Sequence, residues 1–259
     1  MSPRIGSITE LLYKKSKDPI IQPTTGDIPS HEMHRDITGG AARAAVFGVS
    51  DGLVSNITLI LGVAGAHPAA NLVRLAGLAG LVGGAWSMGI GEYVSMSAQR
   101  ELFEREIAIE AAEIERRPEG ESTELARIYE SRGVPREIAE QFAAHMMVDP
   151  KVALATHAKE ELGIDPDSMG SPWQAAISSF FAFAVGAFLP LLPWFFTTGV
   201  SGIETSIVIA IFASIIIGGG LAWATGRSYL RTVTRQVILS AIAAGITFGV
   251  GRLIGFSAA

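Results

Sequence analysis

Residues 44–66 read AAVFGVSDGLVSNITLILGVAGA, an unbroken apolar stretch whose only charged side chain is the carboxylate of Asp51. A stretch of this length matches the ~30 Å hydrocarbon core of a bilayer, so we predict a membrane-spanning helix. A carboxylate inside such a helix costs about 2.5–3.5 kcal/mol on insertion scales, and ionisable residues in this position usually have a function. Asp51 is therefore the first candidate for a functional residue.

Four further apolar stretches are also long enough to cross a membrane. They cover residues 72–97, 173–197, 203–225 and 237–256. No alternating strand pattern is present. We therefore predict an all-α polytopic membrane protein with five transmembrane helices, embedded in a lipid bilayer.

The acidic residues are concentrated between the second and third apolar stretches. Residues 98–170 hold 17 of the 25 Asp and Glu residues, against nine Lys and Arg. This excess of negative charge disfavours nucleic-acid binding and suits divalent cations. We divide the chain into a polar tail, a first membrane part, an acidic helical insert and a second membrane part, at residues 1–40, 41–97, 98–170 and 171–259.

Proline and glycine positions predict four helices in the insert. Residues 98–117 continue the second membrane helix. Ser122 or Thr123 is predicted to cap a short helix that ends near residue 132. The other two helices are expected at residues 135–148 and 151–163.

Basic residues outside the membrane stretches predict the orientation. The tail, the insert and the connection between the last two stretches are rich in Lys and Arg, whereas the other connections are nearly free of them. Segments rich in Lys and Arg usually face the cytoplasm. We therefore expect a cytoplasmic N-terminus and insert, and a C-terminus on the opposite side.

Met88, Glu92 and Met96 follow one another at a spacing of four residues, which places them on one face of a helix. Thioether sulfur is a soft ligand and carboxylate a hard one, a mixture that suits a borderline divalent ion such as Fe²⁺. Alternatively, the two methionines only pack against neighbouring helices, and Glu92 lies at the membrane interface.

Asp51 and Ser55 have the same spacing, and Asn56 is adjacent. Their oxygens are candidates to complete a coordination shell, and Asp51 can accept a proton when the metal leaves. Hydrogen bonds between helices are the alternative for Ser55 and Asn56.

The insert contains a second candidate metal site. Glutamates that recur along one helix face repel one another, and a bound cation would offset that repulsion. A histidine with two glutamates on the last insert helix adds further ligands; a solvated charged face is the alternative. The candidate ligands are Glu106, Glu110, Glu113, Glu121, Glu124, His157, Glu160 and Glu161.

Several classes of function are disfavoured. The chain has no cysteine, which excludes disulfides, cysteine-bound zinc and iron–sulfur clusters. It has no Glu-x-x-His motif of the di-iron carboxylate type and no phosphate-binding glycine loop. We therefore expect neither an enzyme nor an ATP-driven pump.

Three motifs carry a resemblance to a known family. They are GVSDGL at residues 48–53, SMGIGEY at residues 87–93 and LPLLP at residues 189–193. In this order, with an acidic helical insert after the second span, the chain resembles the vacuolar iron transporter family of plants, yeast and prokaryotes. The resemblance covers nearly the whole chain from about Ile37.

The resemblance implies a homodimer of five-span subunits, with an ion path lined by the first two spans of each subunit. It implies that Asp51 and Met88 lie on that path. It also implies metal-binding glutamates in the insert, at Glu110, Glu113, Glu121, Glu124 and Glu161. Two positions depart from the plant pattern: Gly80 replaces a glutamate, and His157-Ala158 replaces a pair of methionines.

We therefore expect a proton antiporter that moves Fe²⁺, with Mn²⁺ as a second ion, out of the cytoplasm for iron homeostasis. No permanent cofactor is expected; Fe²⁺, Mn²⁺, Co²⁺ and Zn²⁺ are candidate bound or transported ions. A prokaryotic plasma membrane is the expected location. The alternative is a membrane-anchored iron-binding, ferroxidase-like storage or sensor protein.

Overall fold

The computed structural model describes residues 40–66, 69–166 and 169–257. The predicted tail, residues 1–40, lies outside the described residues except for Gly40. The described residues form helices joined by short connections and contain no strand. The prediction of an all-α protein is confirmed.

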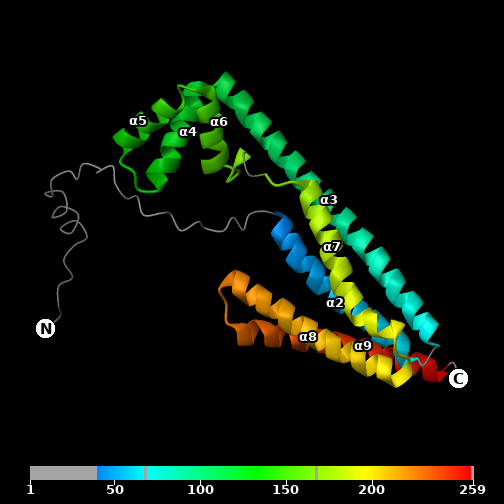
Figure 1. The fold of residues 1–259 in the computed structure, drawn as a ribbon. Coiled ribbons are helices and arrows are strands. Elements are labelled where there is room, and N and C mark those ends of the chain that lie inside the picture. Colours follow the sequence, from blue (N-terminus) through cyan, green and yellow to red (C-terminus); the bar gives the residue numbers. More distant parts are fainter. Residues whose placement is uncertain (1–39, 67–68, 167–168, 258–259) are drawn as a thin grey trace, which may run out of the picture. The chain divides into compact units, whose positions relative to one another are not determined.

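Five helices are long and apolar enough to cross a membrane, which confirms the predicted number (Figure 1). Membrane-spanning backbone has to satisfy its own hydrogen bonds, and a helix does so. The third of these helices ends in a short 3₁₀ segment, η2. The elements are α2 (Gly40–Gly65), α3 (Ala70–Arg116), α7 (Pro172–Leu191) with η2 (Leu192–Phe195), α8 (Gly199–Thr225) and α9 (Tyr229–Ser257).

Helix α3 is much longer than a bilayer is thick. Its 47 residues extend for about 70 Å, against ~30 Å for a hydrocarbon core. The apolar half, residues 72–97, fits the membrane, and the charged half continues into the insert as predicted. The one helix therefore connects the membrane part to the insert without a break.

The insert consists of α4 (Pro118–Ser131), α5 (Arg136–Met146) and α6 (Pro150–Glu160) together with the charged half of α3. The predicted cap at Ser122 or Thr123 is wrong, because α4 begins at Pro118. Proline is tolerated in the first turn, where its missing N–H would have no helical acceptor. Thr123 lies inside the helix, and its hydroxyl donates to the carbonyl of Glu119 at 2.8 Å.

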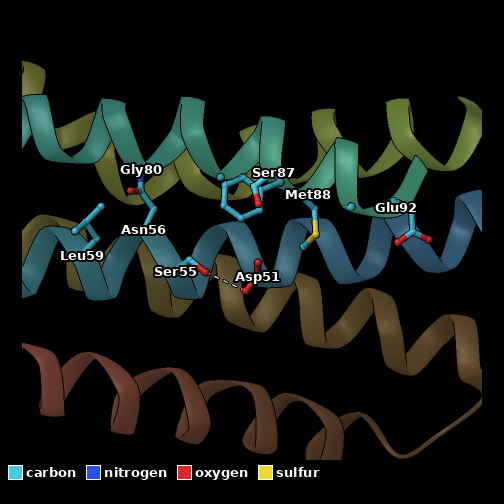
Figure 2. Close-up of a pocket in the computed structure, with 11 residues that line it drawn as sticks. Asp51, Ser55, Asn56, Leu59, Gly80, Ser87, Met88 and Glu92 are labelled. Atoms are coloured by element: carbon cyan, nitrogen blue, oxygen red, sulfur yellow. Dashed lines mark hydrogen bonds between the residues drawn. The ribbon is translucent and has the colours of Figure 1, made fainter. Parts of the chain in front are cut away.

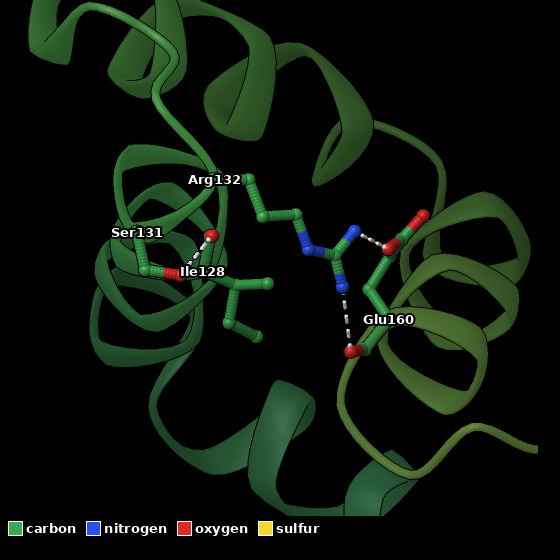
Figure 3. Close-up of polar contacts among 4 residues, drawn as sticks. All are labelled: Ile128, Ser131, Arg132 and Glu160. Carbon is green, nitrogen blue, oxygen red and sulfur yellow. Dashed lines mark hydrogen bonds and ion pairs between the residues drawn. The ribbon is translucent and has the colours of Figure 1, made fainter.

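Helices α4 and α6 are tied together by Arg132 and Glu160 (Figure 3). The Arg132 guanidinium forms an ion pair with the Glu160 carboxylate and also donates to the Glu160 carbonyl at 3.2 Å. A small apolar cluster of α4 and α5, Leu125, Ala126, Ala139 and Ala143, forms the core of the insert. Glu160 therefore has a structural partner.

Helix α2 packs closely on α7 through glycines. A Cβ atom at Gly48 would lie 2.8 Å from the carbonyl oxygen of Ser179, and one at Gly52 would overlap the carbonyl oxygen of Phe183. Across the same interface, Asn56 donates from Nδ2 to the carbonyl of Ala187 at 2.6 Å. Small residues allow such close approach between membrane helices.

We predict that Gly52→Ala destabilises the protein, because the added methyl group has to push α2 away from α7. Overpacking of this kind costs about 1–3 kcal/mol. The measurement is the thermal unfolding midpoint in detergent, with Gly83→Ala as the matched control, since a Cβ at Gly83 meets no atom within 4 Å. Equal midpoints for the two variants would contradict the proposed packing role.

Candidate metal-binding sites

A cleft of about 340 Å³ lies between α2 and α3 (Figure 2). Most of its polar side chains were predicted from the sequence. Its lining residues are Asp51, Ser55, Asn56 and Leu59 of α2, Gly80, Gly84, Ser87, Met88, Gly91 and Glu92 of α3, and Phe183 of α7. Two carboxylates, one thioether and one amide thus line the same cleft.

Asp51 is oriented by its own helix. The hydroxyl of Ser55, one turn further along α2, donates to Asp51 Oδ1 at 2.9 Å. Among the described residues, no cation pairs with Asp51 and nothing else donates to its carboxylate. The remaining oxygen is therefore available to a ligand in the cleft.

Asn56 presents a second oxygen to the same space. The side chain is only 1% exposed, and its Oδ1 has no hydrogen-bond donor among the described residues. A Cβ at Gly80 would lie 2.8 Å from this oxygen, so the absence of a side chain at Gly80 leaves room in front of it. A buried acceptor without a partner costs about 1–3 kcal/mol, which a bound cation would offset.

Glu92 has a partner that the sequence analysis did not find. Arg43 of α2 forms an ion pair with it, with Arg43 Nη2 3.0 Å from Glu92 Oε1. The Glu92 side chain is 13% exposed, whereas that of Arg43 is 70% exposed. An ion entering beside Glu92 would therefore have to compete with Arg43 for the carboxylate.

The two predicted methionine ligands, Met88 and Met96, lie in different surroundings. Met88 lines the cleft, whereas Met96 does not. Met96 is buried against Ala44 and Ala175, as the packing alternative predicts. Of the six residues predicted for the ion path, Met96 alone lies outside this cleft.

A separate cluster of metal-ligand type lies in the insert. His157 of α6 places Nδ1 3.0 Å from Glu110 Oε1 of α3 and 3.7 Å from Glu161 Oε2. His157 is fully buried and Glu110 nearly so, and neither imidazole nitrogen has a hydrogen-bond partner among the described residues. Imidazole and carboxylates in this proximity are suitable ligands for Fe²⁺, Mn²⁺, Co²⁺ or Zn²⁺.

The electrostatics of this cluster favour a cation. Burial raises the pKa of Glu110 to about 7, and four nearby carboxylates add to the increase: Glu161, Glu121, Glu113 and Glu124. Burial also raises the pKa of Glu121, and Glu124 contributes in the same direction. These glutamates, all predicted as ligands, therefore gather around Glu110 and His157 and repel one another without a metal.

Three of the predicted insert ligands have arginine partners. Glu113 lies 4.0 Å from Arg117. Glu106 lies 3.4 Å from Arg105, and Glu160 pairs with Arg132. None of the three belongs to the three-ligand cluster found among the described residues. The sequence could not separate them from Glu110 and Glu161, because all are glutamates on helices that meet in the insert.

We predict that His157→Ala weakens Co²⁺ binding to the insert at least about tenfold, because loss of a supporting partner alone already costs that much. His145→Ala is the matched control, since His145 is exposed on α5 and lies outside the cluster. Co²⁺ is titrated calorimetrically and by its visible absorption. Equal affinities for the two variants would exclude His157 as a ligand.

Co²⁺ affinity should rise with pH up to about 7, by roughly tenfold per unit, because the metal has to displace the Glu110 proton. The free energy of unfolding of the metal-free protein should change in the opposite direction and fall as the pH rises. A raised pKa stabilises the folded state below the unfolded value of 4.5, and that contribution is lost as the pH rises through about 7. Calorimetric titrations below, at and above pH 7 test this, and Glu110→Gln should flatten the profile.

Comparison with known proteins places this architecture in a family. A model described as the VIT family matches residues 42–252. Vacuolar iron transporter 1 of Arabidopsis thaliana is 30% identical over 237 residues, covering 90% of this chain and 94% of that protein. The vacuolar iron transporter of Acanthamoeba castellanii is 33% identical over 256 residues, covering 95% and 92%. The chain belongs to the VIT family.

Proposed function

We propose that this protein moves Fe²⁺, with Mn²⁺ as a second ion, out of the cytoplasm in exchange for protons. The observation that carries the proposal is the cleft between α2 and α3, where Asp51, Asn56 and Met88 meet. Relatives named as vacuolar iron transporters support iron as the ion. In this proposal the protein has no permanent cofactor and no enzymatic activity.

The cleft provides a chemical basis for exchange. Asp51 carries a negative charge when it holds a metal ion and becomes neutral when it takes up a proton. An unneutralised charge is costly inside an apolar helix. Binding either a metal ion or a proton at all times therefore lowers the free energy of the Asp51 carboxylate. Met88 adds a soft ligand that favours a borderline ion over Mg²⁺.

The insert acts as a reservoir for this path. Glu110 and Glu92 lie on the same unbroken helix, about 27 Å apart along its axis. Ions held at Glu110, His157 and Glu161 would be concentrated on the side of the membrane from which the cleft is filled. Arg43, paired with Glu92, stands where an ion would enter the cleft.

A second copy of the chain would complete the path. Ser55 and Ser87 line the cleft yet are exposed in the single chain, so one wall of the cleft is open. The homodimer implied by the family resemblance would close it. A multi-pass location in a prokaryotic plasma membrane, with the insert on the cytoplasmic side, completes the proposal.

A membrane-anchored iron-binding or ferroxidase-like protein is the alternative, favoured by the buried ligand cluster of the insert. The two functions differ in what removal of that cluster does. A transporter that lacks Glu110 and His157 should retain part of its ion flux through the cleft. A storage protein should lose its iron binding and have no flux to retain.

We predict that Asp51→Asn lowers Fe²⁺ uptake into proteoliposomes at least about a hundredfold, since it removes the charge that alternates between metal and proton. Glu204→Gln is the matched control, because Glu204 is an exposed carboxylate of α8 that lies outside the cleft. It should transport at the rate of the unmodified protein. Full uptake by Asp51→Asn would contradict the proposed function.

A further inference from the structure

A second polar cavity, unrelated to the ion path, lies where α8 turns into α9. Its volume is about 480 Å³. Leu221 and Thr225 of α8 form one side, and the connection and first turns of α9 form the other. The residues from that second side are Arg227, Ser228, Arg231, Thr232 and Arg235.

Three arginines share this cavity without a carboxylate. Arg231 and Arg235 lie one turn apart on α9, a spacing at which like charges repel, and Arg227 joins them from the connection before the helix. None of them forms an ion pair with another described residue, and the sequence contains no Asp or Glu after Glu204. The two helices that build the cavity therefore cannot neutralise it, and an anion from outside would.

Hydroxyl-bearing residues also line the cavity. Thr232 is only 7% exposed and forms part of its wall. The hydroxyl of Thr225 donates to the carbonyl of Leu221 at 2.7 Å. The first N–H groups of α9, which lack helical acceptors, begin at the same place.

The position of the cavity identifies the source of the anion. Trp223 and Tyr229, on either side of the turn, are 63% and 54% exposed. Aromatic residues of this kind mark the level of lipid headgroups. The apolar stretches of the two helices end at residue 225 and begin again at residue 237, so the arginines between them lie at headgroup depth.

We propose that the Arg227–Arg231–Arg235 cavity binds a phosphate group, supplied by the headgroup of an anionic phospholipid. Guanidinium groups donate paired hydrogen bonds to phosphate oxygens, and Thr232 supplies one more donor. Basic pockets between membrane helices are suited to such headgroups. Free inorganic phosphate has the same chemistry and is the other possible source.

Native mass spectrometry of the full chain in detergent tests the proposal, with phosphatidylglycerol and phosphatidylcholine as probes. Phosphatidylglycerol should bind roughly tenfold more tightly, because it alone adds net negative charge. Arg231→Gln should weaken its binding about fivefold, and Arg227→Gln/Arg231→Gln about twenty-five-fold. Arg231→Lys, which keeps the charge but loses the paired donors, should lie between.

The control is Arg252→Gln, which removes another exposed arginine near the other end of α9. It should leave phosphatidylglycerol binding unchanged. Thr232→Val is a second variant that leaves the arginines intact, and it should weaken binding without changing the net charge. Circular dichroism of each variant verifies that the helices are formed.

A parallel titration with inorganic phosphate separates the two sources. Displacement of bound phosphatidylglycerol by phosphate, with the same dependence on Arg231, supports the lipid headgroup as the occupant. Arginine-dependent phosphate binding without lipid selectivity supports the phosphate site but overturns the lipid source. Equal losses in Arg231→Gln and Arg252→Gln, or no selectivity for either anion, overturn the proposal.

Discussion

The close contact between α2 and α7 is the constraint on which the rest of the structure depends. Gly48 and Gly52 allow the two backbones to approach, and the Asn56 amide donates across the same interface. With this face of α2 fixed, the neighbouring face presents Asp51 and Ser55 to α3. A carboxylate in an apolar helix is tolerable only if it faces polar groups or a ligand, and this packing provides such a surrounding. The cleft is therefore a consequence of how α2 is held.

The continuous helix α3 links two sites that differ in how negative charge is handled. In the membrane, one carboxylate is held by a serine of its own helix and another is paired with Arg43. In the insert, a buried histidine and two glutamates form a cluster that contains no arginine, and burial, together with nearby carboxylates, raises the pKa of Glu110 to about 7. The insert therefore groups an imidazole with carboxylates of metal-ligand type, whereas the cleft holds the Asp51 carboxylate, which has no cationic partner among the described residues.

The sequence predicted the five long helices, the continuation of α3 and the types of ligand, because hydropathy and helical spacing act locally. It did not predict the start of α9 at Tyr229, since the arginine-rich first turns carry no apolar signal. It also missed the pairs Arg43–Glu92 and Arg132–Glu160, which join residues far apart in the chain. Helical spacing placed Met96 with Met88 and Glu92, but the drift of such a stripe around the helix turns Met96 toward Ala44 and Ala175.

The most direct test of the central claim is the internal pH of sealed proteoliposomes during Fe²⁺ uptake, recorded with a trapped dye while the membrane potential is clamped by a potassium ionophore. If metal and proton alternate at Asp51, Fe²⁺ entry should drive protons out, and the internal pH should rise in step with the iron taken up. Fe²⁺ entry at a constant internal pH would contradict the exchange of metal for protons.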